Sequence, residues 1–264
     1  MSAVVISGGL IHYEAFGRGR PVIFIHGWLG SWRYWMRTME ALAADYRAYA
    51  LDLWGFGDSD KSKERYSVDD YTHLVHEFMD QLGIPGASLV GHSLGAIIAL
   101  RLTNLEPSRV LRLAVVSLPL TPRTVSNRLL AYGDTNSPLT KMLWWRQISH
   151  KDVQAEAEKA AENAVTLSVQ SVLEIDAQSL LMQVSQPTLV IYGEKDSVID
   201  PEPARTLLDG GQRRSLRPIG LADSKHFPML EEANKFNRLL KDFLEAGDDL
   251  SGLSLKEEWK RRTR

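Results

Sequence analysis

The sequence contains 264 residues, of which 44% are hydrophobic and 24% are charged, and its formal net charge at pH 7 is -2. This length accommodates one large α/β domain with an insertion, or two small domains, and the balanced charge excludes a basic surface for nucleic acid. The sequence has no cysteine, which excludes disulfides, cysteine-ligated metal sites and a cysteine nucleophile.

The N-terminal sequence lacks the features of a secretory signal. No Lys or Arg precedes its short apolar stretch, which ends at Gly8 and Gly9. No apolar run approaches the ~20 residues that a membrane-spanning helix needs. We therefore expect a cytoplasmic protein, monomeric or homodimeric, that binds neither membranes nor nucleic acid.

Short apolar segments alternate with longer helical patterns along most of the chain. The predicted strands are Ile11–Phe16, Pro21–His26, Arg47–Asp52, Ala87–Val90, Leu111–Ser117, Thr188–Tyr192 and Arg214–Ile219. The predicted helices are Tyr34–Ala44, Val68–Leu82, Ser93–Leu105, Pro203–Leu208 and Leu230–Glu245. Several strands are apolar throughout, which is typical of strands buried on both faces of a parallel sheet. The alternation predicts a doubly wound, mostly parallel α/β sheet.

The segment 121–177 interrupts this alternation because it contains no strand pattern. It includes a strongly helical run in which Ser149 and Asp152 form a predicted capping box. We predict that this segment is a helical cap on a core made of residues 1–120 and 178–247. Ligands of open α/β sheets bind at the carboxyl ends of the strands, so a lid that lines a pocket is favoured over a purely structural layer.

The last segment, 248–264, is polar and highly charged, and it follows the end of a predicted helix. We expect a frayed tail. The alternative is a short amphipathic helix around Leu253, Leu255 and Trp259.

The pentapeptide Gly91-His92-Ser93-Leu94-Gly95 matches the pattern G-x-S-x-G between a predicted strand and a predicted helix. This is the setting of a nucleophile elbow, where a sharp turn exposes a serine hydroxyl. Such a turn crowds its neighbours, so the residues two before and two after the serine must be small. The alternative is a tight turn in which the serine is incidental.

A serine hydroxyl needs a base to become a nucleophile. We favour His226, which follows the last predicted strand and precedes the last helix, so that it reaches the sheet edge. The competing histidines are His12, His26, His73, His76, His92 and His150.

The base needs a carboxylate that holds its tautomer. Asp196 is favoured because it lies at the carboxyl end of a buried strand, one element before His226. Asp200 is second, although it precedes Pro201 and suits a helix cap better. Asp223 is too close to the histidine in sequence to approach it from behind the ring.

An oxyanion needs two preorganised donors. One is expected from the backbone N–H of Leu94, at the start of the helix. The other is expected from the loop after the strand VIFI, at the N–H of Trp28, because Gly27 lets the backbone approach the site. We expect His26 to brace this loop by hydrogen bonds.

At this point the chain resembles the α/β-hydrolase superfamily, in its small, esterase-like branch with a helical cap. Five stretches carry the resemblance, in the family's order: FIHGW, DLWGFGDSD, GHSLG, TLVIYGEKD and KHFPMLEE. The match covers about Ile11 to Leu244. The resemblance implies an eight-stranded sheet, no cofactor and no metal.

Carried over by motif, the resemblance implies that Ser93 is the nucleophile, Asp196 the acid and His226 the base, with Trp28 and Leu94 as oxyanion donors. Serine at position 93 disfavours haloalkane dehalogenases and epoxide hydrolases, which use aspartate there. The chain also lacks the HGGG loop of one esterase branch and the extra glycines common in carbon–carbon bond hydrolases.

The sequence therefore predicts a carboxylesterase for small to medium, largely apolar esters. Aromatic residues near the oxyanion loop and in the cap, among them Trp28, Trp144 and Trp145, are predicted to bind substrate; the alternative is that they hold the lid to the core. A lactonase, a carbon–carbon bond hydrolase and a cofactor-free perhydrolase or haloperoxidase remain open on the same triad. A hydroxynitrile lyase and a non-catalytic ligand receptor are less favoured.

Overall fold

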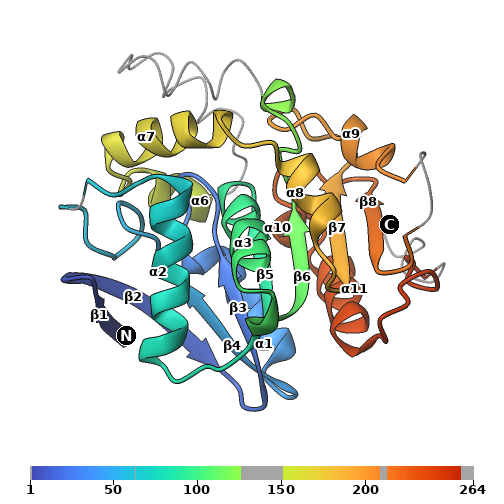
Figure 1. Cartoon of the computed structure of the whole chain (residues 1–264), viewed down its shortest axis with the longest axis horizontal. Helices are drawn as coiled ribbons and strands as arrows, with labels where there is room; N and C mark the ends of the chain where they lie inside the picture. The colour runs from blue at the N-terminus through green and yellow to red at the C-terminus, as the bar shows by residue number, and fades with distance from the viewer. Residues whose placement is uncertain (1, 63, 126–150, 209–212, 257–264) are drawn as a thin grey trace.

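An eight-stranded sheet forms the centre of the computed structural model, which describes residues 2–62, 64–125, 151–208 and 213–256 (Figure 1). The strand order is β1-β2-β4-β3-β5-β6-β7-β8, with β1 and β2 antiparallel to their neighbours and all other pairs parallel. The strands are β1 Ser2–Ile6, β2 Gly9–Phe16, β3 Arg20–Ile25, β4 Tyr46–Leu51, β5 Ala87–His92, β6 Val110–Val116, β7 Thr188–Gly193 and β8 Leu216–Leu221. The predicted doubly wound, mostly parallel sheet is confirmed.

The apolar segments of the sequence are the central strands, and the half-polar segments lie at the edge. All six residues of β5 and all six of β7 are buried, as expected for strands covered on both faces. The edge strand β1 alternates between more and less exposed residues, and its short run gave no clear signal, so it was missed. The last strand begins at Leu216, two residues later than predicted.

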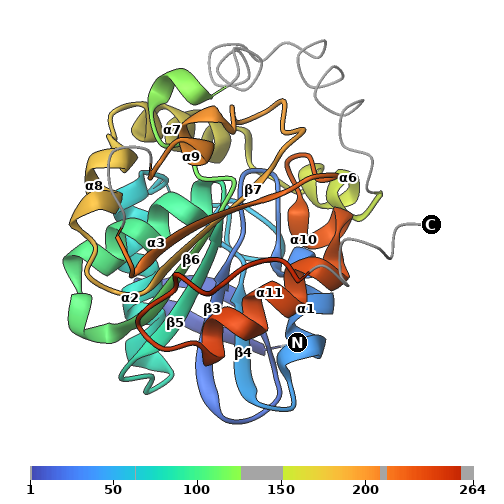
Figure 2. The same cartoon turned by 90° about the vertical axis from the view of Figure 1, so that its right-hand side faces the viewer.

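Helices cover both faces of the sheet. Figure 2 shows α1 and α11 on one side of the strands and α2, α3 and α8 on the other. The bounds are α1 Met36–Leu42, α2 Val68–Gln81, α3 Leu94–Leu105, α8 Ala177–Gln183, α9 Glu202–Arg205, α10 Pro228–Glu231 and α11 Ala233–Glu245. Helix α2 begins with a capping box, in which Ser67 and Asp70 satisfy each other's backbone N–H groups. None of the described helices combines the length and the apolar character needed to cross a membrane.

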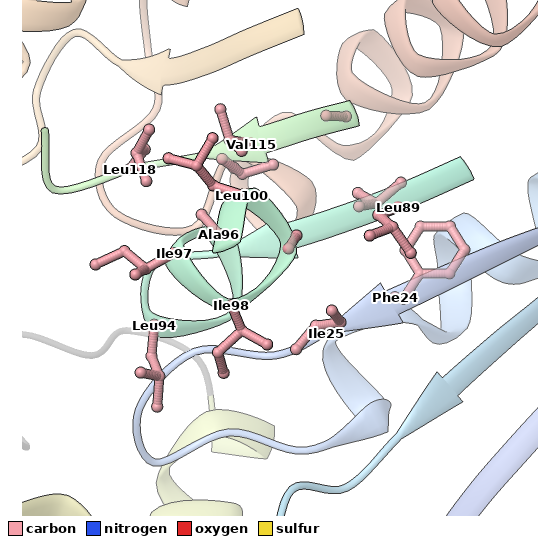
Figure 3. Close-up of a cluster of buried hydrophobic side chains, with 14 of the residues drawn as sticks. Phe24, Ile25, Leu89, Leu94, Ala96, Ile97, Ile98, Leu100, Val115 and Leu118 are labelled. Atoms are coloured by element: carbon pink, nitrogen blue, oxygen red, sulfur yellow. The ribbon is translucent and has the colours of Figure 1, made fainter. Parts of the chain in front are cut away.

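Helix α3 is the most buried helix in the core and packs against β5 and β6 (Figure 3). Its side chains Ile97, Ile98 and Leu100 are at most 1% exposed, and they belong to the same buried cluster as Ile25 of β3 and Val115 of β6. Burying such side chains contributes roughly 1.5–3 kcal/mol each. This packing fixes the first turn of α3, and with it the position of Ser93.

Two further helices, α6 Lys151–Ala157 and α7 Glu162–Leu173, precede α8 in the segment between β6 and β7. The helical run predicted from Ser149 is therefore two helices with a break, and the predicted capping box lies outside the described residues. Trp144 and Trp145 lie outside them too. Helix α7 contacts both α2 and α3, and Figure 1 shows it above them, at the end of the molecule toward which β6 and β7 point.

The described part of the last segment, residues 248–256, is packed rather than frayed. Leu250 and Leu253 are 1% and 8% exposed. The N–H of Leu250 donates to the carbonyl of Arg214 over 2.7 Å, and Arg217 Nε donates to the carbonyl of Leu253 over 2.9 Å. The expectation of a frayed tail was wrong here because two leucines cover the start of β8. Trp259 lies outside the described residues.

Candidate active site

Ser93 occupies a sharp turn between β5 and α3, as the sequence predicted. Its backbone has φ 53° and ψ -112°, a conformation that L-residues rarely adopt. The flanking glycines are required by contact: a Cβ on Gly91 would collide with the carbonyl of Gly95, and a Cβ on Gly95 would collide with the carbonyl of Ile25. The turn therefore stores strain at one residue, and its neighbours permit no side chain.

The hydroxyl of Ser93 is buried and makes no hydrogen bond with any described residue. Buried hydroxyls are normally paired, and an exception calls for a functional explanation. The backbone at this position is well held, since the N–H of Ser93 donates to the carbonyl of Val116 over 2.8 Å.

Asp196 and His226 form a buried pair, with 2.8 Å between Asp196 Oδ2 and His226 Nδ1. The other carboxylate oxygen accepts the N–H groups of Val198 and Ile199 over 2.8 and 3.0 Å. Burial alone would raise the pKa of Asp196, but the neighbouring imidazole and these hydrogen bonds outweigh it and hold the pKa below its ordinary value. The carboxylate is therefore ionised and fixes the tautomer in which His226 Nδ1 carries the proton.

The backbone carbonyl of His226 is hydrogen-bonded to the residue that precedes Ser93. This carbonyl accepts from His92 Nε2 over 2.8 Å and from the hydroxyl of Ser117 over 3.3 Å. The rings of His92 and His226 lie 4.8 Å apart, centroid to centroid. Burial, with the nearby His226, holds the pKa of His92 well below its usual value, so His92 is neutral. The residue before Ser93 thus brings the histidine loop to the serine turn.

Glu231 holds the same loop from the other side. Its Oε2 accepts the N–H groups of Lys225 and Phe227, the two neighbours of His226, over 2.6 and 3.3 Å. The sequence reasoning missed the supporting roles of Glu231, His92 and Ser117. The motif KHFPMLEE contained a signal, because a carboxylate four or five residues after the histidine loop is well placed to accept its amides.

The competing carboxylates lie elsewhere. Asp200 accepts the N–H of Glu202 over 3.0 Å at the start of α9, which is the cap that the sequence suggested. Asp223 is exposed and pairs with Lys195 over 2.8 Å. Of the competing histidines, His73 is exposed, and His150 lies outside the described residues.

The loop after β3 approaches the elbow closely. A Cβ on Gly27 would lie 2.9 Å from the Cβ of Ser93 and 2.8 Å from His92 Nδ1. His26 braces this loop as expected: its Nε2 accepts the N–H of Leu53 over 3.0 Å, so its Nδ1 donates to the carbonyl of Gly27 over 2.8 Å. Burial lowers the pKa of His26, which keeps the ring neutral in this role.

The two predicted oxyanion donors, the backbone N–H groups of Leu94 and Trp28, lie at the start of a helix and in a loop. Leu94 is the first residue of α3, so its N–H has no acceptor within the helix. The backbone N–H of Trp28 forms no hydrogen bond with the described residues, while its indole is buried and donates to Ser168. Trp35 is fully buried in the core, and its ring centroid lies 5.1 Å from that of Phe24, with the two rings tilted.

One group of residues has the composition of a metal site. Ligand atoms of His12, Asp52 and Asp58 lie within 4.8 Å of one another. However, Asp52 already accepts from the N–H groups of Trp32 and Asp58, over 2.7 and 2.9 Å, and from His12 Nδ1 over 3.0 Å. Asp58 is paired with Arg33 over 3.1 Å. The donor atoms are thus occupied by the loop that they stabilise, and this cluster is structural.

Comparison with known proteins agrees with this geometry. The family model described as alpha/beta hydrolase fold matches residues 20–140, which include the serine turn and the loop after β3. The chain therefore has the α/β-hydrolase fold, and residues 20–140 match the family of that name. Asp196 and His226 lie beyond the matched residues, so any role for them depends on the geometry of this α/β-hydrolase itself.

Relatives of this α/β-hydrolase carry several activities in their names. It is 27% identical to the 2-hydroxymuconate semialdehyde hydrolase of Pseudomonas sp. strain CF600, over 93% of this chain and 94% of that one. It is 27% identical to the pimeloyl-[acyl-carrier protein] methyl ester esterase of Aeromonas hydrophila, over 89% and 99%. The crystal structure of the enol-lactonase from Burkholderia xenovorans LB400 superposes with a TM-score of 0.79 at 19% identity, over 93% and 100%, which shows a shared fold.

Proposed function

We propose that this hydrolase cleaves carboxylic esters of small to medium, largely apolar molecules through a covalent acyl-enzyme. The proposal depends most on the buried Asp196–His226 pair at 2.8 Å, whose loop is attached to the serine turn. A serine in a strained turn beside an imidazole that is oriented by a carboxylate is the arrangement used for acyl transfer.

In the first step, His226 Nε2 removes the proton of Ser93 Oγ as the oxygen attacks the ester carbonyl. Asp196 keeps the other ring proton on Nδ1 and stabilises the imidazolium that forms. The serine and the imidazole are not hydrogen-bonded in this structure. Catalytic hydrogen bonds commonly tighten only in the complex with substrate.

The carbonyl oxygen becomes negatively charged and is stabilised by the backbone N–H groups of Leu94 and Trp28. Each such donor lowers the barrier by roughly 3 kcal/mol. The alcohol then leaves with the proton from His226. In the second step, water activated by His226 attacks the acyl-enzyme and releases the acid and Ser93.

We assign residues 121–177 the role of a cap over this site. In favour, α7 contacts the core helices α2 and α3 and is connected to the loop after β3 through Trp28. The predicted substrate contacts of Trp144 and Trp145 belong to the same proposal.

Hydrolysis of a carbon–carbon bond is the second candidate, because a relative aligned over nearly its whole length is a 2-hydroxymuconate semialdehyde hydrolase. Against it, His26-Gly27 is followed by Trp28 rather than by further glycines. Vinylogous diketones would be turned over preferentially if this candidate held, and esters only slowly.

The test uses p-nitrophenyl esters of graded acyl length on the wild type, Ser93→Ala and the control Ser88→Ala, a serine on the same strand β5. We expect kcat/KM of Ser93→Ala to fall by on the order of 10⁴ or more and that of Ser88→Ala to stay near wild type. Lactones, vinylogous diketones and peracid formation, assayed in parallel, identify the preferred substrate class. Equal turnover by Ser93→Ala and wild type would refute the proposed function.

A further inference from the structure

Trp28 connects the proposed oxyanion loop to helix α7 by one buried hydrogen bond. Its indole Nε1 donates to the hydroxyl of Ser168 over 2.9 Å, although the two residues are 140 positions apart. Trp28 is 3% exposed and Ser168 is fully buried. A bond shielded from water in this way leaves either partner unsatisfied when the other is removed.

Ser168 is well suited to be a fixed acceptor. Its hydroxyl proton is already directed along α7, toward the carbonyls of Ala164 and Val165 at 2.5 and 3.1 Å. A serine hydroxyl has one proton and two lone pairs, so the oxygen turns a lone pair to the indole. The acceptor therefore has a defined direction.

Helix α7 is itself held to the core near this contact. The N–H of Ala161, just before the helix, donates to the carbonyl of Gly55 over 2.7 Å. Ala164 packs so closely on Gly55 that a Cβ there would collide with it. One turn after Ser168, the hydroxyl of Ser171 accepts the N–H of Val68 over 3.0 Å. The acceptor of the Trp28 indole is thus part of an anchored element.

The peptide group between Gly27 and Trp28 is held by hydrogen bonds on its carbonyl side. The carbonyl of Gly27 accepts from His26 Nδ1 over 2.8 Å and from the N–H of Gly30 over 3.2 Å, whereas Leu29, which follows Trp28, has a strained φ of 59°. The peptide group between Gly27 and Trp28 carries the N–H that would bind the oxyanion. An indole held at its far end restricts rotation of this backbone, and catalytic donors must stay within about 0.5 Å of their productive position.

We propose that Ser168 is a positioning residue for oxyanion stabilisation, acting through the Trp28 indole to orient the Trp28 backbone N–H. This inference rests on the proposed acyl-enzyme mechanism. Ser168 touches neither substrate nor the reacting atoms in this account. Its effect is confined to the charge that develops in the transition state, so it affects kcat rather than KM.

The experiment compares Ser168→Ala with Thr166→Ala, which removes a hydroxyl of the same helix that donates to the carbonyl of Glu162 over 3.2 Å. We expect kcat for the best p-nitrophenyl ester to fall about tenfold in Ser168→Ala, less than the 10²–10³ for complete loss of an oxyanion donor, with KM within about twofold. The affinity for a trifluoromethyl ketone, which forms a tetrahedral adduct on the serine, should fall by a similar factor. Thr166→Ala should keep wild-type kcat and inhibitor affinity.

Two further variants separate positioning from general destabilisation. Ser168→Thr keeps a hydroxyl that bonds the preceding turn of a helix and should recover kcat. Trp28→Phe removes the donor and should lose as much kcat as Ser168→Ala, and the double variant should lose no more than either single one. Trp28→Phe also tests the proposal if Ser168→Ala does not fold.

The inference is overturned if Ser168→Ala or Trp28→Phe retains wild-type kcat, if Thr166→Ala loses as much, or if the losses in the double variant add. Failure of the proposed function has a different signature, namely full turnover by Ser93→Ala.

Discussion

The strained turn at Ser93 should make the wild-type protein less stable than variants that lack the hydroxyl. Ser93 has φ 53° and ψ -112°, and its buried hydroxyl makes no hydrogen bond with the described residues. Ser93→Ala removes the hydroxyl and keeps the strain. Ser93→Gly removes both, since glycine adopts positive φ without steric cost.

The magnitudes follow from these two features. A residue held in a sparsely populated backbone region costs about 1–3 kcal/mol, and glycine loses about 0.5–1 kcal/mol more than alanine through the flexibility of the unfolded chain. Ser93→Gly should therefore be more stable than Ser93→Ala by about 1 kcal/mol. Ser93→Ala should exceed the wild type by about 1 kcal/mol, the smaller end of the cost of an unpaired buried hydroxyl, and Ser93→Gly should exceed it by about 2 kcal/mol.

The assay is urea unfolding at pH 7 with the same pair of substitutions at Ser88 as a control. Ser88 lies on the same strand, next to a register shift, and is not among the residues with positive φ, so there the glycine variant should be less stable than the alanine variant by about 0.5–1 kcal/mol. The order of glycine and alanine should thus reverse between the two positions. The reasoning is refuted if Ser93→Gly is no more stable than Ser93→Ala.

Three other predictions concern Gly27, Asp196 and the buried His12–Asp52 pair. Gly27→Ala places a methyl carbon 2.9 Å from the Cβ of Ser93, so kcat should fall by about 10²–10³, as for loss of an oxyanion donor. The circular dichroism spectrum of Asp196→Asn should match that of the wild type. Because the amide favours the wrong imidazole tautomer, kcat should fall by about 10⁴. The hydrogen bond with Asp52 raises the pKa of His12 in the folded protein. Protonated His12 therefore stabilises the fold fully at a pH below the pKa of the unfolded chain, about 6.5, and this contribution is lost as the pH rises through the pKa of the folded protein. His12→Gln should therefore cost more unfolding free energy at a pH of about 5.5 than at about 8.5, as measured by urea titration.

Each of these has its own contradicting result. Gly247→Ala, at a site where a methyl group meets nothing within 4 Å, serves as control for Gly27→Ala, and equal kcat in the two would contradict the close approach. An Asp196→Asn enzyme with kcat within about tenfold of wild type would contradict the role of the carboxylate. A cost of His12→Gln that is constant with pH would show that the protonated pair does not contribute.

The serine turn was predictable because its requirements are local. Positions 91 and 95 need small residues because backbone carbonyls lie close to them, within a few residues or on the adjoining strand. The two glycines at this spacing therefore predict the turn from the sequence. The positions of Asp196 and His226 were predictable for a related reason. Both follow strands, and the carboxyl ends of parallel strands meet at one edge of the sheet.

The supporting contacts were not predictable because they join residues distant in sequence through side-chain geometry. His92 lies next to the serine, yet its partner is a carbonyl 134 positions away. Trp28 was expected near substrate, and nothing in its neighbourhood in the sequence indicates Ser168 as its partner. Propensity and periodicity describe which face of an element is buried, not which polar group it meets there.

Strand β1 and the last segment are parts of the fold that the sequence did not predict. Strand β1 is paired with β2 from Ser2 to Ile6, but its apolar run is too short for periodicity to identify a strand. Leu250 and Leu253 stand in a charged segment, and their burial depends on the surface that β8 offers them. In both cases the neighbouring strand, rather than the local sequence alone, decided the structure.

The central claim is that Ser93 is the nucleophile, and covalent labelling tests it most directly. A fluorophosphonate should add one phosphonyl group per chain, and peptide mass spectrometry should locate it on Ser93. The adduct should be absent from Ser93→Ala and should form far more slowly in His226→Ala. An adduct on another residue, or full ester turnover by a protein in which Ser93 stays unlabelled, would contradict the account.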